Sequence, residues 1–303
     1  MLPDESTRET LGAALSDKSS HIVARAATIA AELDVSLLAD QMAQKLLALI
    51  PLPYKSDPTC AAKIALAEAL VQLRYQDETP FLEGIRHIQL EPVFGGKEDT
   101  AGSLRASCAL GLVQASHPDA MTLLADLLAD PEADARIGAV KAFAASGETA
   151  ALPLLRYKAQ VGDKSPAVMH ASFVALLQLD WNGSQVLIER LLFGEDDVVA
   201  EAAIIALGES QRADAVQILT SFWEKSMHLQ RKQTALSALA LLRFEESLDF
   251  LFELLAYAPK QYAQDAIQAL RILDADPDIR DRIREVSDGR PDLELGKYSR
   301  KTN

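Results

Sequence analysis

The sequence predicts an all-α fold, an α-solenoid of stacked antiparallel helix pairs. Three observations predict it: the composition, an apolar pattern repeated at a nearly fixed interval, and turn residues between its copies. Alanine and leucine fill 49 and 46 of the 303 positions, whereas aromatic residues make up only 6%. This composition favours helices and excludes both a disordered chain and a β architecture rich in Val, Ile and Thr.

An Ala-Leu-like pair recurs along the chain, and the residue six positions before each pair defines a register position. Five of the six intervals between register positions are 31–33 residues long, and the first interval is 42. A second apolar pair follows eighteen and nineteen residues after the register position, and further apolar residues continue it with helical spacing. Each unit is therefore predicted to be two helices that bury their apolar faces by stacking on their neighbours. The register positions are Lys63, Arg105, Arg136, Met169, Ala200, Lys232 and Ala263.

The first part of the chain, residues 1–58, is predicted to be a degenerate N-terminal helical cap. Two helices are expected there, over residues 20–33 and 37–50, and the second ends at Pro51-Leu52-Pro53. Terminal repeats are atypical because one of their faces meets water, which explains the weaker pattern.

The repeat array is expected to span residues 59–286. Turn residues such as Asp130-Pro131 and Ala258-Pro259 separate its helices. A short Arg-rich helix over 278–286 is predicted to cap the stack. Residues 287–303 carry glycine, proline and charge, and we expect them to form a flexible C-terminal tail.

One copy of the repeat, residues 130–143, resembles the short bacterial HEAT-like repeat of the type named after phycobilin lyases. The resemblance lies in an acidic turn, Arg136, and an Ala-rich helix with a Leu-Gly-like end. The copy that ends at Ala206-Leu207-Gly208 shares this end but has Ala200 in place of the arginine. The resemblance covers roughly residues 60–273 and implies a HEAT/armadillo-like superhelix. It implies little about function, because this repeat occurs in scaffolds, lyases and other enzymes.

Helical geometry assigns faces to the helix that carries each register position. Offsets 0, +3, +4 and +7 share one side and are predicted to be buried. Offsets +2, +5 and +9 lie opposite, and in the solenoids that this chain resembles the opposite side lines the concave surface. Small residues at +2 and apolar residues at +5 predict a groove for a helix or extended peptide of a protein partner. The partner-binding residues expected there are Leu110, Lys141, Val174 and Ile205 at +5, and Gln114 and Gln178 at +9. The alternative is that neighbouring helices cover these positions or that isolated apolar residues face water.

The 42-residue interval contains about ten extra residues, which predict an inserted loop near residues 91–100. Its glycines, Gly95-Gly96, permit a sharp turn. Because long loops in repeat proteins often carry binding function, Glu91, Phe94 and Asp99 are predicted to contribute to the partner site. The alternative is an ordinary connection in which Phe94 plugs the core.

No catalytic, metal or cofactor site is predicted. The five histidines form neither a His-Glu dipeptide nor a His-x-x-x-His pair, which speaks against the iron-dependent hydroxylases built on this repeat. His87 and Glu91 are four residues apart and could share a helix face, but two ligands do not make a metal site. The sequence contains no Gly-rich phosphate loop and no nucleophile elbow. Cys60 and Cys108 are expected to be reduced core thiols of a cytoplasmic protein.

Charge and hydropathy limit the partners. The net charge of −14 argues against a general nucleic-acid binder. A DNA glycosylase built from HEAT-like repeats would need a basic groove, whereas Lys141 is the only base on the predicted concave face. The chain lacks an uninterrupted apolar run of 18 residues, and its first residues do not resemble a signal peptide, so we expect neither a membrane span nor export.

The sequence therefore predicts a non-catalytic scaffold or adaptor that binds a protein partner through its concave face and the inserted loop. The alternative function is an accessory factor or subunit of a lyase- or hydroxylase-type system that modifies a protein.

Overall fold

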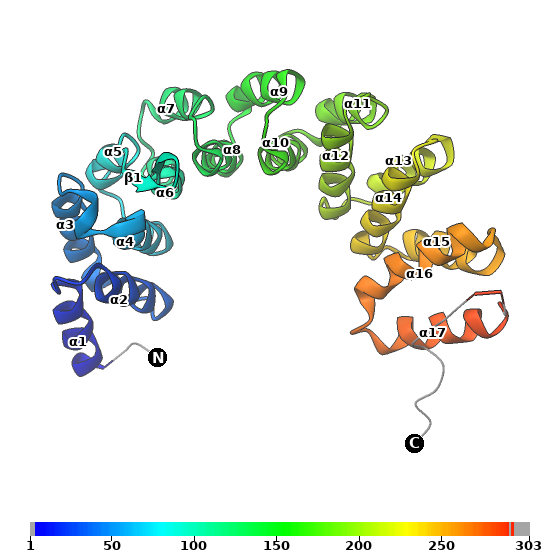
Figure 1. The fold of residues 1–303 in the computed structure, drawn as a ribbon, viewed down its shortest axis with the longest axis horizontal. Helices are drawn as coiled ribbons and strands as arrows, with labels where there is room; N and C mark the ends of the chain where they lie inside the picture. The colour runs from blue at the N-terminus through cyan, green and yellow to red at the C-terminus, as the bar shows by residue number, and fades with distance from the viewer. Residues whose placement is uncertain (1–3, 291, 294–303) are drawn as a thin grey trace. The chain divides into compact units, whose positions relative to one another are not determined.

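The computed structural model describes residues 4–290 and 292–293, and it confirms the all-α prediction (Figure 1). The chain divides into two compact units, Met1–Tyr157 and Lys158–Asn303, here called the N-terminal and C-terminal units. The division lies inside helix α9 (Leu152–Val161), within the predicted repeat array. The domain boundaries predicted at 58 and 286 remain predictions.

In the N-terminal unit, the helical pair predicted near the start of the chain is confirmed as α2 and α3. A further helix, α1, precedes it and was not predicted. Helices α2, α4, α6 and α8 pack one against the next. The helices are α1 (Glu5–Leu15), α2 (Ser20–Glu32), α3 (Ala39–Leu49), α4 (Ala61–Gln72), α5 (Thr79–Gly84), α6 (Gly102–Gln114), α7 (Ala120–Leu127) and α8 (Ala133–Ser146).

In the C-terminal unit, α10, α12, α14 and α16 pack in sequence, and α11, α13 and α15 pack against them. The helices are α10 (Pro166–Leu179), α11 (Trp181–Leu192), α12 (Asp197–Glu209), α13 (Asp214–Lys225), α14 (Leu229–Leu242), α15 (Glu245–Tyr257), α16 (Lys260–Leu270) and α17 (Pro277–Asp288). The seven predicted register positions all lie in α4, α6, α8, α10, α12, α14 and α16, which we call the register helices.

The predicted buried face of the register helices is confirmed except at offset 0 of α8, where Arg136 is half-buried. Every residue at offsets +3, +4 and +7 is buried, including Phe143 and Leu207 at +7, which are fully buried. Burial of one such side chain contributes about 1.5–3 kcal/mol. The repeated Leu and Phe residues at this offset therefore supply much of the stability of each helix pair.

Small residues at offset +2 let neighbouring register helices approach closely. A Cβ added to Gly138 would lie 2.3 Å from the Cα of Ala106, so α8 contacts α6 at a distance that only glycine permits. Ala171 and Ala202 are also buried. At Gly138 the neighbouring helix therefore covers the expected small-residue floor of a groove, whereas Ala202 lines a hollow between α10 and α12 that is described below.

The end of the described chain is packed. The predicted cap helix is confirmed as α17, and Asp276 caps it by accepting a hydrogen bond from Asp278 N. Beyond it, Arg290 donates to the carbonyl oxygens of Leu255 and Ala256 at 2.9 and 3.0 Å, and Leu293 is buried. The predicted tail otherwise falls at 291 and 294–303, outside the described residues. Over the part that the structure describes, each helix is too short or too polar to cross a lipid bilayer.

Candidate protein-binding surfaces

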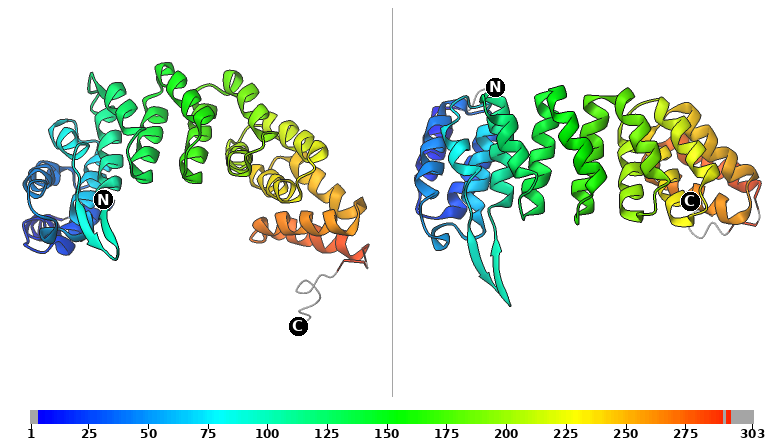
Figure 2. Two further views of the ribbon diagram at one scale, coloured as in Figure 1. Left: turned by 45° about the horizontal axis from the view of Figure 1, so that its top comes forward. Right: turned by 90° about the horizontal axis from the view of Figure 1, so that it is seen from above.

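The segment predicted as an inserted loop near residues 91–100 is a β-hairpin. Strands β1 (Leu90–Val93) and β2 (Gly96–Asp99) pair antiparallel, with Val93 opposite Gly96. The turn uses Gly95 at φ 89°, in the left-handed region that glycine adopts without strain. The hairpin projects beyond the ends of the neighbouring helices of its unit (Figure 2).

Phe94 stands at the hairpin turn with its side chain fully exposed. The alternative that Phe94 plugs the core is therefore wrong. Ile88, Leu90 and Val93 are also exposed, at 64%, 52% and 45%. We call these four residues the hairpin patch. Exposed apolar residues scattered singly need no explanation, but here four of them lie within seven positions, on and beside the hairpin.

Glu91 lies at the base of the hairpin and is held there by three hydrogen bonds. Its Oε1 accepts from Thr59 N at 2.6 Å, from Gln89 Nε2 at 2.8 Å and from Thr100 Oγ1 at 2.8 Å. Burial raises the pKa of this carboxyl, but the three donors outweigh that effect and hold the pKa below its ordinary value. Glu91 lies in β1, so the idea that it shares a helix face with His87 is wrong.

Asp99, the third residue expected in the loop, joins the hairpin to α6. Its Oδ1 accepts from the backbone N–H groups of Gln89 and Ala101, and its Oδ2 lies 2.8 Å from Arg105 Nη1. Burial raises the pKa of Asp99, whereas these hydrogen bonds and the arginine charge lower it, and the net shift is downward. Arg105 is itself buried and also forms two hydrogen bonds with Asp130, at 2.7 and 2.8 Å.

A second buried ion pair lies beside this one. Lys63 and Asp57 are both fully buried, with Nζ 3.3 Å from Asp57 Oδ2 and 2.7 Å from Gln89 Oε1. The neighbouring turn is strained, because Thr59 and Cys60 are consecutive non-glycine residues with φ of 57° and 58°. We call Asp57, Lys63, Gln89, Glu91, Asp99, Arg105 and Asp130 the hairpin root. These bonds fix the hairpin rigidly to α4 and α6.

The predicted residues on the helices of the N-terminal unit are at least partly accessible. Leu110 and Gln114 on α6 are half-buried, and Lys141 on α8 is exposed. The Oε1 of Gln114 is buried and accepts no hydrogen bond from the described residues.

In the C-terminal unit, the structure brings Val174, Gln178 and Ile205 to the surface between α10 and α12. Two hollows lie there, of about 340 and 250 Å³. Ile205 lines the larger one, whereas Val174 and Gln178 line the smaller. The larger is lined by Pro166, Ala167, His170, Val198, Glu201, Ala202 and Ile205. We call the two hollows together the α10–α12 groove.

The α10–α12 groove carries acidic groups beside its apolar lining. His170 Nε2 lies 3.0 Å from Glu209 Oε2, a contact that links α10 to α12. At one end, Trp181 is buried at the start of α11, and the guanidinium of Arg212 lies 5.2 Å from its ring centroid. Trp181 is the first residue of α11, and its burial shows that it serves packing.

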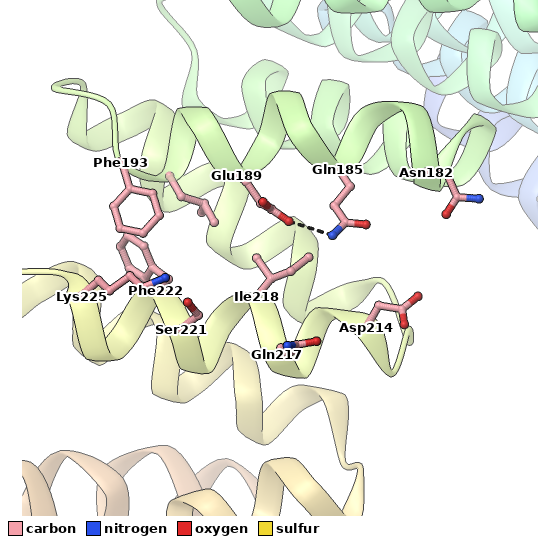
Figure 3. A pocket seen from close by; sticks show the side chains of 11 residues that line it. Asn182, Gln185, Glu189, Phe193, Asp214, Gln217, Ile218, Ser221, Phe222 and Lys225 are labelled. Atoms are coloured by element: carbon pink, nitrogen blue, oxygen red, sulfur yellow. Dashed lines mark hydrogen bonds between the residues drawn. The ribbon is translucent and has the colours of Figure 1, made fainter.

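A third surface, between α11 and α13, was not predicted (Figure 3). This α11–α13 pocket has a volume of about 580 Å³. Its lining repeats at 32 residues, because Asn182 and Gln185 on α11 correspond to Asp214 and Gln217 on α13. That repetition was visible in the sequence, but the separation of the two helices was not.

The described residues hold neither a cluster suited to a metal ion nor a reactive thiol. No three His, Cys, Asp or Glu side chains within the described chain are arranged to bind a metal ion. Cys60 and Cys108 are buried free thiols, and burial raises the pKa of Cys60 to about 12 and that of Cys108 further. The expectation of two core thiols is confirmed.

Comparison with known proteins identifies the repeat. The family model described as HEAT repeats matches residues 184–271, so this segment of the C-terminal unit consists of HEAT repeats. No curated protein sequence matches the chain.

Among solved structures, the chain is similar to the complex of CpcE and CpcF of the phycocyanin lyase from Nostoc. The identity is 18%, the TM-score is 0.45, and the match covers 90% of this chain and 95% of that one. It is also similar to human deoxyhypusine hydroxylase, at 16% identity and a TM-score of 0.33, covering 84% and 96% of the two chains. Likenesses of this size say nothing about substrate or activity.

Proposed function

We propose that this HEAT-repeat chain is a non-catalytic scaffold or adaptor that binds protein partners through the α10–α12 groove and the hairpin patch. The observation that carries the proposal is the apolar hollow of about 340 Å³ between α10 and α12. Val198 and Ile205 line it while 43% and 37% exposed, so their contact with water would be lost when a partner binds.

The chemistry of the groove favours one kind of partner segment. An apolar hollow between two helices accepts the apolar side of an amphipathic helix. Glu201 lines the hollow, and Glu209 lies at the neighbouring one. Carboxylates at the edge of an apolar site favour lysine or arginine beside the apolar side chains of the partner. We therefore expect an amphipathic segment with a basic flank.

The hairpin patch offers a second contact of a different kind. The hairpin root already fixes the backbone that carries Phe94, so a partner would not have to order a flexible loop. Aromatic side chains are frequent among the residues that dominate binding energy at interfaces. Phe94 is accordingly the residue of the patch on which binding should depend most.

The net charge of −14 supports protein partners over nucleic acid, because a phosphate backbone would be repelled. Two cysteines buried as free thiols support a location in the reducing cytoplasm.

Photo-crosslinking tests the groove. Benzoylphenylalanine is placed at Ile205 and, as a matched control, at Val161, an aliphatic residue of the same unit that is 64% exposed. A defined crosslinked partner is expected from position 205 alone. Ile205→Asp should abolish co-purification of that partner, whereas Val161→Asp should not. Equal crosslinking at both positions, or unfolding of the Ile205→Asp variant by circular dichroism, would show that the groove is not the binding surface.

A further inference from the structure

The α11–α13 pocket is separate from the surfaces proposed above and has a different chemical character. We propose that it binds a short extended peptide with a large apolar side chain and, two to four residues away, a lysine or arginine. The volume of about 580 Å³ is that of a typical ligand site.

The dimensions of the pocket set the length of the peptide. Asn182 lies near Asp214 at one end, and Phe193 lies near Lys225 at the other (Figure 3). The two helices therefore run in the same direction along the pocket. Phe193 lies eleven residues after Asn182, a separation of roughly 16 Å along a helix. An extended chain covers that distance with about five residues.

One end of the pocket is apolar. Phe222 is buried in its lining, whereas Phe193 is 53% exposed. Ile218, also buried, lies farther along α13 in the middle of the pocket (Figure 3). The rings of Phe193 and Phe222 lie 5.1 Å apart between centroids and are tilted by 57°. A large aliphatic or aromatic side chain placed against these rings would remove the exposed face of Phe193 from water.

The middle of the pocket carries amide groups. Gln185 donates to Glu189 Oε1 at 2.7 Å and keeps its own amide oxygen available as an acceptor, and Gln217 lies across from it on α13. An amide side chain has both a donor and an acceptor, as a peptide bond does. These amides therefore suit the main chain of a peptide and do not require a particular side chain.

Charges divide the pocket. The carboxylates of Glu189 and Asp214 line it away from the apolar end, and the cation of Lys225 lies at the apolar end. Glu189 is one helical turn from Phe193, about 6 Å, and Asp214 is eight residues from Phe222, about 12 Å. These spans correspond to roughly two and four residues of an extended peptide. A basic side chain is therefore expected at that separation from the apolar residue.

The same features exclude two other occupants. A partner helix, about 10 Å wide with its side chains, would need an unbroken apolar strip along the whole pocket, but Gln185, Glu189 and Gln217 place polar groups in its middle. A compact small molecule would need polar groups that converge on one point, whereas these are spread along the helices.

Selection from a display library of random heptapeptides tests the proposal on the intact protein. Counter-selection uses the Phe193→Ala/Gln217→Ala double variant, because both side chains are exposed and their loss should leave the fold intact. We expect enrichment of peptides that carry the basic and apolar residues at the stated separation. A synthetic peptide of the selected sequence should then bind at least tenfold more weakly to Phe193→Ala, and equally to Val186→Ala, an exposed control on α11 outside the pocket.

A separate measurement tests whether Glu189 and Asp214 bind the basic residue of the peptide. The Glu189→Gln/Asp214→Asn variant should lose the preference for lysine over norleucine at the basic position of the peptide. Ile205→Asp should leave peptide affinity unchanged, which separates this site from the α10–α12 groove. The proposal is overturned if no peptide is enriched over the double variant, or if the carboxylate variant retains the preference for lysine.

Discussion

The hairpin root and the α10–α12 groove use the same repeat position in opposite ways. At the root, the register positions of α4 and α6 are the buried cations Lys63 and Arg105, each paired with carboxylates. In α10 and α12 the corresponding residues are Met169 and Ala200, which are buried without charge. In α4 and α6 the cations anchor the inserted hairpin through directed bonds, whereas in α10 and α12 the apolar residues leave the two helices joined by packing.

This difference has an energetic consequence. Charges buried together are stable only when the set is complete, because removal of one member leaves the others without compensation. Apolar packing is lost in proportion to the atoms removed. The root should therefore behave as a cooperative whole that keeps the hairpin rigid, and the groove should tolerate changes at its surface.

The largest effect is expected from Arg105→Ala. It leaves Asp99 and Asp130 without their guanidinium partner in a buried site, which should cost about 3–5 kcal/mol. The cost is measured by urea unfolding, with hydrogen exchange over residues 57–130 to locate the loss. Lys141→Ala, an exposed substitution in the same unit, should change the free energy of unfolding by less than about 0.5 kcal/mol. Equal effects of the two variants would mean that the root is not cooperative.

In α12, substitutions at Leu207 and Ile205 distinguish the contribution of a core side chain to stability from that of a surface side chain. Leu207→Ala removes a fully buried side chain at offset +7 and should cost about 2–5 kcal/mol. Ile205→Ala removes a side chain that is 37% exposed and should cost less than half as much. Thermal and urea unfolding of the two variants measure both values. Equal costs would place Ile205 in the core and remove the basis for the groove.

The helical part of the fold could be predicted because its pattern is local. Burial at offsets +3, +4 and +7 follows from the period of the α-helix and the repeated Ala and Leu residues. The hairpin has no comparable pattern, since Leu90-Glu91-Pro92-Val93 is short and contains a proline that is unfavourable within a strand. Its pairing depends on anchors distant in sequence.

The roles of the candidate site residues depended on contacts that the sequence does not reveal. Glu91 and Asp99 were expected to contact a partner, but Thr59 and Arg105 engage them internally. Phe94, from the same segment, was expected either to contribute to a partner site or to plug the core; the structure excludes the plug, because Phe94 is fully exposed. The distance between neighbouring helices, which the sequence does not give, determines that Gly138 is covered and that the α11–α13 pocket is open.

A smaller effect, confined to binding, is expected from Phe94→Ala. Because the side chain is fully exposed, the free energy of unfolding should change by less than about 0.5 kcal/mol. If Phe94 is an interface anchor, its loss should weaken partner binding by about 2 kcal/mol or more, and Phe94→Leu should restore part of it. Quantitative co-purification of the partner crosslinked through position 205 measures this. Unchanged recovery would show that the hairpin patch does not contact that partner.

The last prediction concerns the acid dependence of the N-terminal unit. The pKa of Asp99 is lower in the folded chain than its ordinary value, so its contribution to stability is present above the unfolded pKa of about 3.9 and is lost as the pH falls below it. Asp99→Asn should therefore be less stable than the wild type at pH 7, and the two stabilities should converge as the pH falls toward 3. Urea unfolding as a function of pH measures the convergence. Glu98→Gln removes an exposed carboxylate from the same strand and serves as the matched control. If the free energies of unfolding of Asp99→Asn and the wild type differed by the same amount at every pH, Asp99 would not be the titrating member of the root. The ion pair between Asp99 and Arg105 would then not account for the stability of the hairpin root.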